Sequence, residues 1–159
     1  MFNAKGYLEP GFHDWNATQI EDNLVKAFPN SKTRPNIFSG YQKLMIELSK
    51  VGLPHEQWLN GSFSSSKEDP NDVDMVSFLD YDEVNKLTPD KQQILLEIFA
   101  GPNTKSKYLC DSYYVPIVDK SHPNYAQLHQ VRMYWYGEFG LDRDENPKGI
   151  VRFPPKGTP

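Results

Sequence analysis

Cysteine is almost absent from this sequence of 159 residues, in which Cys110 is the only one. A single cysteine excludes an internal disulfide and any metal site built from several thiolates. It stands within Tyr108-Leu109-Cys110-Asp111, which favours a small buried strand residue over a reactive thiol. The four histidines also lack metal-ligand spacing such as H-x-x-x-H, so we expect surface or capping roles for them.

Long apolar runs and an excess of positive charge are missing as well. No stretch approaches the roughly 18 apolar residues of a membrane-spanning helix, and the N-terminus lacks a signal-peptide pattern. We therefore expect a cytoplasmic protein without a membrane partner. The formal net charge of -4 argues against strong nonspecific nucleic-acid binding, which needs a basic face to neutralise phosphates.

The length and apolar content predict one folded domain. A hydrophobic fraction of 38% is enough for a core, and 159 residues leave no room for a separate substrate domain. Residues 1–159 should therefore form a single domain. Within it, residues 1–16 are expected to be an N-terminal arm, and the proline-rich residues 154–159 a frayed tail.

Apolar periodicity and capping residues predict four helices and four strands. The helices are expected from a Thr18–Glu21 capping box to about Pro29, from Pro35 to Gly52, from Pro89 to Gly101, and from Pro123, after a Ser121 cap, to about Tyr136. The strands are expected at 57–60, 73–79, 108–118 and 150–153, the last one in a hairpin or at a sheet edge. This order predicts an α/β (α+β) fold, with a small mixed sheet, helices on one face and the acids on the open face.

Residues 58–80 hold the most informative pattern. Asp72 and Asp74 flank one apolar residue at the start of a strand, so both side chains point to the same face about 6–7 Å apart. Two carboxylates at that spacing suit Mg²⁺, which is usually held by one or two carboxylates plus substrate phosphates. Gly61 allows close approach of a phosphate, and Ser62 adds a hydroxyl and an N–H. The stretch predicts a site for a metal-bound triphosphate.

Further phosphate contacts are expected from the loop that follows Ser62. Ser64 belongs to a run of three serines that fits a flexible surface loop and a substrate contact equally well. Lys67 either reaches a phosphate or is simply solvated. A less specific candidate for triphosphate contact is the most basic segment, which contains Arg143, Lys148 and Arg152.

Asp111 interrupts the apolar run 108–118, and burying a lone carboxylate is costly. If this strand lies beside 73–79, Asp111 would be a third metal ligand or the base for an attacking hydroxyl. Asp80 and Asp119 are weaker candidates, because they stand at strand ends where an acid needs no explanation. A structural acid with a hydrogen-bond partner remains the alternative for Asp111.

Gly61-Ser62, nine intervening residues and Asp72-Val73-Asp74-Met75 resemble the signature of the DNA polymerase beta-like nucleotidyltransferase superfamily. The resemblance implies a nucleotidyltransferase-like fold, an NTP substrate, Mg²⁺ or Mn²⁺, and a third acid on a later strand, for which Asp111 is the best match. Pro10-Gly11, Arg34 and residues 142–151 look like a smaller bacterial and phage group without an assigned substrate.

The leading hypothesis is transfer of a nucleoside monophosphate from an NTP to a hydroxyl of an unknown acceptor, whether protein, RNA or small molecule. Asp72, Asp74 and Asp111 would be the catalytic and metal-binding residues, and Gly61 and Ser62 would hold the β- and γ-phosphates. The alternative is a catalytically silent protein of the same fold, such as a toxin–antitoxin or regulatory partner. The sequence leaves oligomerisation open.

Overall fold

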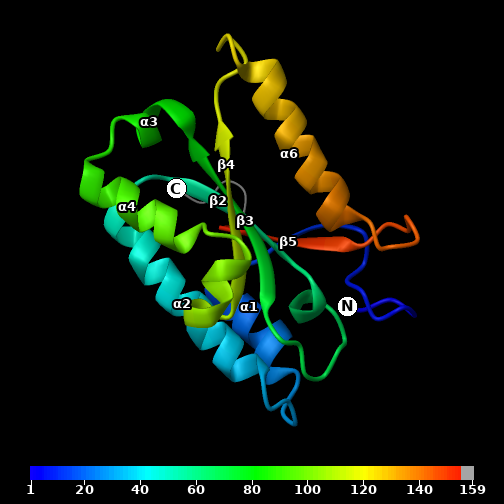
Figure 1. Ribbon diagram of the computed structural model, residues 1–159. Helices are drawn as coiled ribbons and strands as arrows, with labels where there is room; N and C mark the ends of the chain where they lie inside the picture. The colour runs from blue at the N-terminus through cyan, green and yellow to red at the C-terminus, as the bar shows by residue number, and fades with distance from the viewer. Residues whose placement is uncertain (155–159) are drawn as a thin grey trace.

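A computed structural model describes residues 1–154, which form one five-stranded mixed sheet with helices around it (Figure 1). The strand order across the sheet is β1-β5-β2-β3-β4. The strands are β1 (Gly11–Asp14), β2 (His55–Asn60), β3 (Val73–Asp80), β4 (Cys110–Ile117) and β5 (Gly149–Phe153). The pairs β1–β5 and β3–β4 are parallel, whereas β2 is antiparallel to both β3 and β5. The predicted α/β class with a mixed sheet is confirmed.

Helices and short helical turns connect the strands. They are α1 (Ala17–Glu21), the π-helical turn η1 (Asp22–Lys26), α2 (Arg34–Val51), the 3-10 turn η2 (Ser62–Ser64), α3 (Tyr81–Asn85), α4 (Pro89–Ile98), the 3-10 turn η3 (Pro102–Thr104), α5 (Lys105–Tyr108) and α6 (Tyr125–Gly140). Helix α2 has proline in its first turn and ends at Gly52 in the left-handed conformation (φ 78°), as its sequence predicts.

The N-terminal cap of α1 differs from the prediction. Its capping box is formed by Asn16 and Gln19 and not by the Thr18–Glu21 pair. The Asn16 side chain accepts from the Gln19 N–H at 2.9 Å, and the Gln19 side chain accepts from the Asn16 N–H at 3.0 Å. Both pairs have the spacing of a capping box, but only Asn16 has the extended backbone that a cap position needs.

Both faces of the sheet are covered, although the sequence predicted helices on one face only. The larger core packs Leu44 and Leu48 of α2 and Ile98 of α4 against one face. The smaller core places Phe139 of α6 against Trp58 and Phe78 on the opposite face. Figure 1 accordingly shows α2 and α4 on one side of the sheet and α6 on the other. The face expected to be open therefore has a helix over it.

The two ends of the chain were predicted least well. The expected arm 1–16 contains β1, and Leu8 within it is fully buried. β5 is an inner strand between β1 and β2, and not the predicted hairpin or edge strand. A parallel pairing of two remote segments leaves no local pattern in either one. Residues 155–159 of the predicted frayed tail lie outside the described residues.

The last helix begins and ends later than predicted. Asn124, not Ser121, precedes α6, and the helix continues to Gly140, four residues past the expected end at Tyr136. Cys110 is fully buried in β4 as predicted, and burial raises the pKa of its thiol to about 12. Within residues 1–154, none of the helices has both the length and the apolar character needed to cross a bilayer.

Candidate functional site

Three carboxylates meet on the α6 face of the sheet. In the parallel pair β3–β4, Asp74 lies directly opposite Asp111, and Asp72 lies just before β3. Asp74 alternates with Met75 of the larger core and therefore shares its face with Val76, which belongs to the core under α6. The predicted placement of Asp111 beside Asp74 is thus found in the structure.

The weaker acid candidates lie away from this cluster. Asp80 stands at the other end of β3, where its side chain caps α3 by accepting from the Glu83 N–H at 2.9 Å. Asp119 is exposed and lies beyond the end of β4. Neither residue belongs to the group formed by Asp72, Asp74 and Asp111.

Gly61 packs directly against the carboxylate of Asp74. It follows the last residue of β2, Asn60, which is paired with Asp74 across the sheet. Its backbone has φ 76° and ψ -161°, a region that only glycine adopts readily. A Cβ atom added to Gly61 would lie 1.9 Å from Oδ2 of Asp74. Glycine is therefore required here both by the backbone conformation and by the neighbouring carboxylate.

Arg34 fixes the loop that follows Gly61. Its guanidinium is fully buried and stacks on Phe28, with Cζ 3.7 Å from the ring centroid. All of its N–H groups donate to backbone carbonyls at 2.7–3.3 Å, namely those of Leu24, Phe63, Ser65, Lys67 and Glu68. Burial lowers the pKa of Arg34 to about 10. Four of the five carbonyls belong to the 61–68 loop, so Arg34 sets its path.

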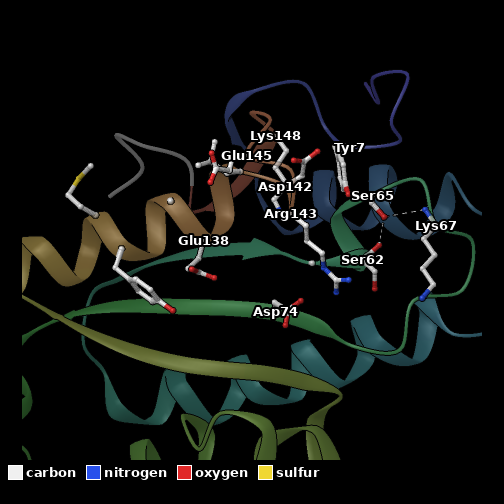
Figure 2. Close-up of a pocket in the computed structure, with 15 residues that line it drawn as sticks. Tyr7, Ser62, Ser65, Lys67, Asp74, Glu138, Asp142, Arg143, Glu145 and Lys148 are labelled. Atoms are coloured by element: carbon white, nitrogen blue, oxygen red, sulfur yellow. Dashed lines mark hydrogen bonds between the residues drawn. The ribbon is translucent and has the colours of Figure 1, made fainter.

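Asp74 opens onto a cavity of about 1080 Å³ between the sheet, the 61–68 loop, α6 and the turn before β5 (Figure 2). Asp111 lines a smaller adjoining cavity of about 310 Å³, which shares Gly61 and Asp74 with the larger one. Gly61, Ser62 and Asp74 line the larger cavity on the sheet side. The opposite wall comes from α6 and from the turn, and includes Tyr134 and Glu138. Its cationic lining residues are Lys67, Arg143 and Lys148. Figure 2 shows the Arg143 side chain extending into the cavity toward Ser62.

Some of the predicted phosphate contacts line the cavity and others do not. Lys67, Arg143 and Lys148 line the cavity, as does Ser65. Ser64 does not, because its side chain is buried in η2 without a hydrogen-bond partner. Of the serine run 64–66, Ser65 is the residue that lines the cavity. Arg152 points elsewhere and forms an ion pair with Asp14, with Nη2 to Oδ2 at 2.7 Å.

Lys105 is a member of this site that the sequence did not reveal. Its Nζ lies 2.7 Å from Oδ2 of Asp72 and 3.0 Å from Oδ2 of Asp111. Hydrogen bonds first to Asp72 and then to Asp111 raise the pKa of Lys105, so it stays charged at neutral pH. No motif marks this lysine, since it approaches the acids from the short helix α5.

Asp74 lies in a partly buried position close to two other negative charges. Its pKa is raised, first by burial and then by the charges of Asp72 and Asp111. Across the cavity, burial lowers the pKa of Lys148, partly offset by attraction to Asp74. A cation bound beside Asp74 would relieve this repulsion.

The donor set fits Mg²⁺ or Mn²⁺ as a partial ligand set. Oδ1 of Asp111 is buried without a hydrogen-bond partner, and oxygen is the ligand type these ions prefer. No three His, Cys, Asp or Glu side chains within residues 1–154 are grouped closely enough to hold a metal by themselves. Since Mg²⁺ is commonly held by one or two carboxylates and substrate phosphates, the site suits a cation that arrives with a phosphate ligand.

Comparisons with known proteins identify a family but no activity. The search of curated proteins and the search of solved structures each give no match for this chain. The resemblance to the nucleotidyltransferase superfamily therefore stays a prediction. A family model described as "Family of unknown function (DUF6932)" matches residues 1–154. That match covers nearly the whole sequence, and the chain belongs to this family of unknown function, DUF6932.

Proposed function

We propose that this protein is a metal-dependent nucleotidyltransferase, which moves a nucleoside monophosphate from an NTP to a hydroxyl of an acceptor. The observation that carries the proposal is the alignment of Asp74 with Asp111 on neighbouring strands, with Gly61 packed on the Asp74 carboxylate. Gly61 and Asp74 line a cavity whose other lining residues include several cations, and Asp111 lines the adjoining smaller cavity. An anionic substrate next to a carboxylate pair is what phosphoryl and nucleotidyl transfer requires.

The cavity suits a nucleoside triphosphate in size and in charge. Its volume of about 1080 Å³ lies just above the usual range for small-molecule sites, about 300–1,000 Å³. Lys67, Arg143 and Lys148 would neutralise phosphate charge, and Ser62 would donate from its hydroxyl and its N–H. The ring of Tyr134 on α6 offers a surface against which a nucleobase could stack.

The three carboxylates would have different roles in the reaction. Asp74, with Asp72 or Asp111, would hold Mg²⁺ or Mn²⁺, which supplies positive charge for the phosphates and for the leaving pyrophosphate. Asp111 also has a buried oxygen without a hydrogen-bond partner, which could accept the proton of the attacking hydroxyl. Gly61 leaves room for the Asp74 carboxylate, because a side chain there would collide with it, and its bare backbone would allow close approach of a phosphate.

Thermal unfolding with ATP and Mg²⁺ tests the proposal. A ligand at about 100 times its Kd stabilises a protein by about 2.7 kcal/mol. For a chain of this size, each kcal/mol raises Tm by about 2–4 °C, so the wild type should gain about 5–11 °C. The gain should require both ATP and Mg²⁺, and Asp74→Asn should abolish it.

Asp80→Asn is the matched control, because Asp80 lies on the same strand but caps α3 at its far end. Asparagine caps a helix about as well as aspartate, so this variant should respond to ATP and Mg²⁺ like the wild type. Incubation of α-labelled NTPs with cell extract then identifies the labelled acceptor. Equal stabilisation of the wild type and Asp74→Asn would rule out the assigned site.

A catalytically silent interaction protein is the second candidate, and the Lys105 ion pairs favour it. An ammonium group that already neutralises Asp72 and Asp111 lowers their demand for a metal ion. Such a protein would keep the fold and the cavity without turnover. It would show no Mg²⁺-dependent stabilisation by ATP and no transfer of label.

A further inference from the structure

Lys105 lies between two of the three acids of the site. Its Nζ bridges one oxygen of Asp72, at 2.7 Å, and one oxygen of Asp111, at 3.0 Å. Two carboxylates that share one cation between them form the geometry of a metal-binding pair. Here the shared cation is an ammonium group of the chain itself.

The backbone around Lys105 holds the side chain in place. On one side, the Gly101 N–H donates to the Ser112 carbonyl at 2.9 Å, which ties the preceding turn η3 to β4. On the other side, α5 packs closely on α2, because a Cβ added to Gly40 would lie 2.0 Å from the Tyr108 carbonyl oxygen. The helix that carries Lys105 is therefore anchored at both ends, and the ammonium is aimed at the acids by the fold.

Lys105 engages two of the three acids. Its Nζ forms ion pairs with Asp72 and Asp111. Asp74, whose side chain makes no ion pair with Lys105, is the carboxylate left to bind a divalent cation, and the charge of Lys148 across the cavity offsets part of its charge.

We propose that Lys105 replaces one of the two metal ions of the usual nucleotidyl-transfer site, so that this protein binds a single Mg²⁺ or Mn²⁺ at Asp74. The inference rests on the proposed function, because it specifies how that site is loaded. Lys105 acts here as a positioning residue that keeps Asp72 and Asp111 together and sets the metal stoichiometry.

Titration of the metal-free protein with Mn²⁺ at a saturating concentration of a non-hydrolysable ATP analogue, with protein-bound Mn²⁺ counted by equilibrium dialysis, tests the inference. The wild type should bind one Mn²⁺ per chain. Lys105→Met keeps the length of the side chain but removes its charge, and should bind two. Lys107→Met is the matched control, because Lys107 is exposed on the same short helix and has no ion pair with these acids, so it should bind one.

Two Mn²⁺ ions in the wild type, or one in Lys105→Met, would overturn the inference and leave the proposed function standing. No bound Mn²⁺ in either protein would overturn the proposed metal site together with the inference.

A measurement on the wild type alone covers the case in which Lys105→Met fails to fold. Acetylation by an amine reagent, read by mass spectrometry, should be slower at Lys105 than at Lys107, because Lys105 is engaged by two carboxylates. Saturating Mn²⁺ should leave that ratio unchanged. A rise in Lys105 acetylation with Mn²⁺ would mean that the metal displaces the ammonium, and would overturn the inference.

Discussion

Replacing Arg34 with lysine should destabilise the protein and distort the cavity in one step. The guanidinium donates five hydrogen bonds to five backbone carbonyls, whereas an ammonium group has three donors. At least two carbonyls therefore lose their donor. Since a buried unsatisfied group costs about 1–3 kcal/mol, Arg34→Lys should lower the free energy of unfolding by about 2–6 kcal/mol. That is a large part of a typical total of about 5–15 kcal/mol.

Urea unfolding of the two proteins measures the difference through the transition midpoint. Arg143→Lys is the control, because Arg143 is exposed and its replacement should change stability by no more than about 0.5 kcal/mol. ATP binding by folded Arg34→Lys should also weaken, since the freed loop carries Ser62 and Lys67. A stability loss under about 1 kcal/mol would refute the view that Arg34 holds the loop.

Other substitutions test the carboxylates and the glycine beside them. Gly61→Ala should lower the free energy of unfolding in urea by about 1–3 kcal/mol, because of its backbone conformation alone, and should weaken ATP binding. Gly137→Ala is the control: the space around its Cβ is open, so it should not destabilise the protein in the same assay. The pKa of Asp74 is raised in the folded protein, so its charged form disfavours the fold. In EDTA, the free energy of unfolding of Asp74→Asn should therefore exceed that of the wild type once the pH rises above about 4. Equal free energies of unfolding from about pH 3 to 8 would contradict this. Asp111→Asn should slow single-turnover transfer by about a hundredfold or more if Asp111 is a base, and normal turnover with a Tm loss would make it structural.

Local patterns in the sequence were sufficient for the centre of the site. Because Asp72 and Asp74 are two residues apart in an apolar strand, their side chains share one face of the sheet. Gly61 directly precedes the turn η2 that follows β2. Asp111 could be placed because an acid within an apolar run requires a reason to be there. Its position opposite Asp74 follows once the two strands are parallel neighbours.

The rest of the site depends on contacts between distant segments. Arg34 lies at the start of a helix, where an arginine is usually solvated, and nothing nearby in the sequence shows that a loop about 30 residues later closes over it. Lys105 belongs to a turn with no motif of its own. The placement of α6 over the acids is equally hidden, because only Phe139 of that helix is buried and its apolar pattern is weak.

The position of β5 between β1 and β2 has a consequence for the order of assembly. Arg152 of β5 pairs with Asp14 of β1, 138 positions earlier, so this half of the sheet closes through contacts of very long sequence separation. Such contacts form late and slow the search for the native state. The turn that brings Arg143 and Lys148 to the cavity leads directly into β5. In pulse-labelled hydrogen exchange, we therefore expect amides of β2, β3 and β4 to become protected before those of β1 and β5. The centre of the sheet would then form first and the cationic wall of the cavity last. Simultaneous protection of all five strands would contradict this order.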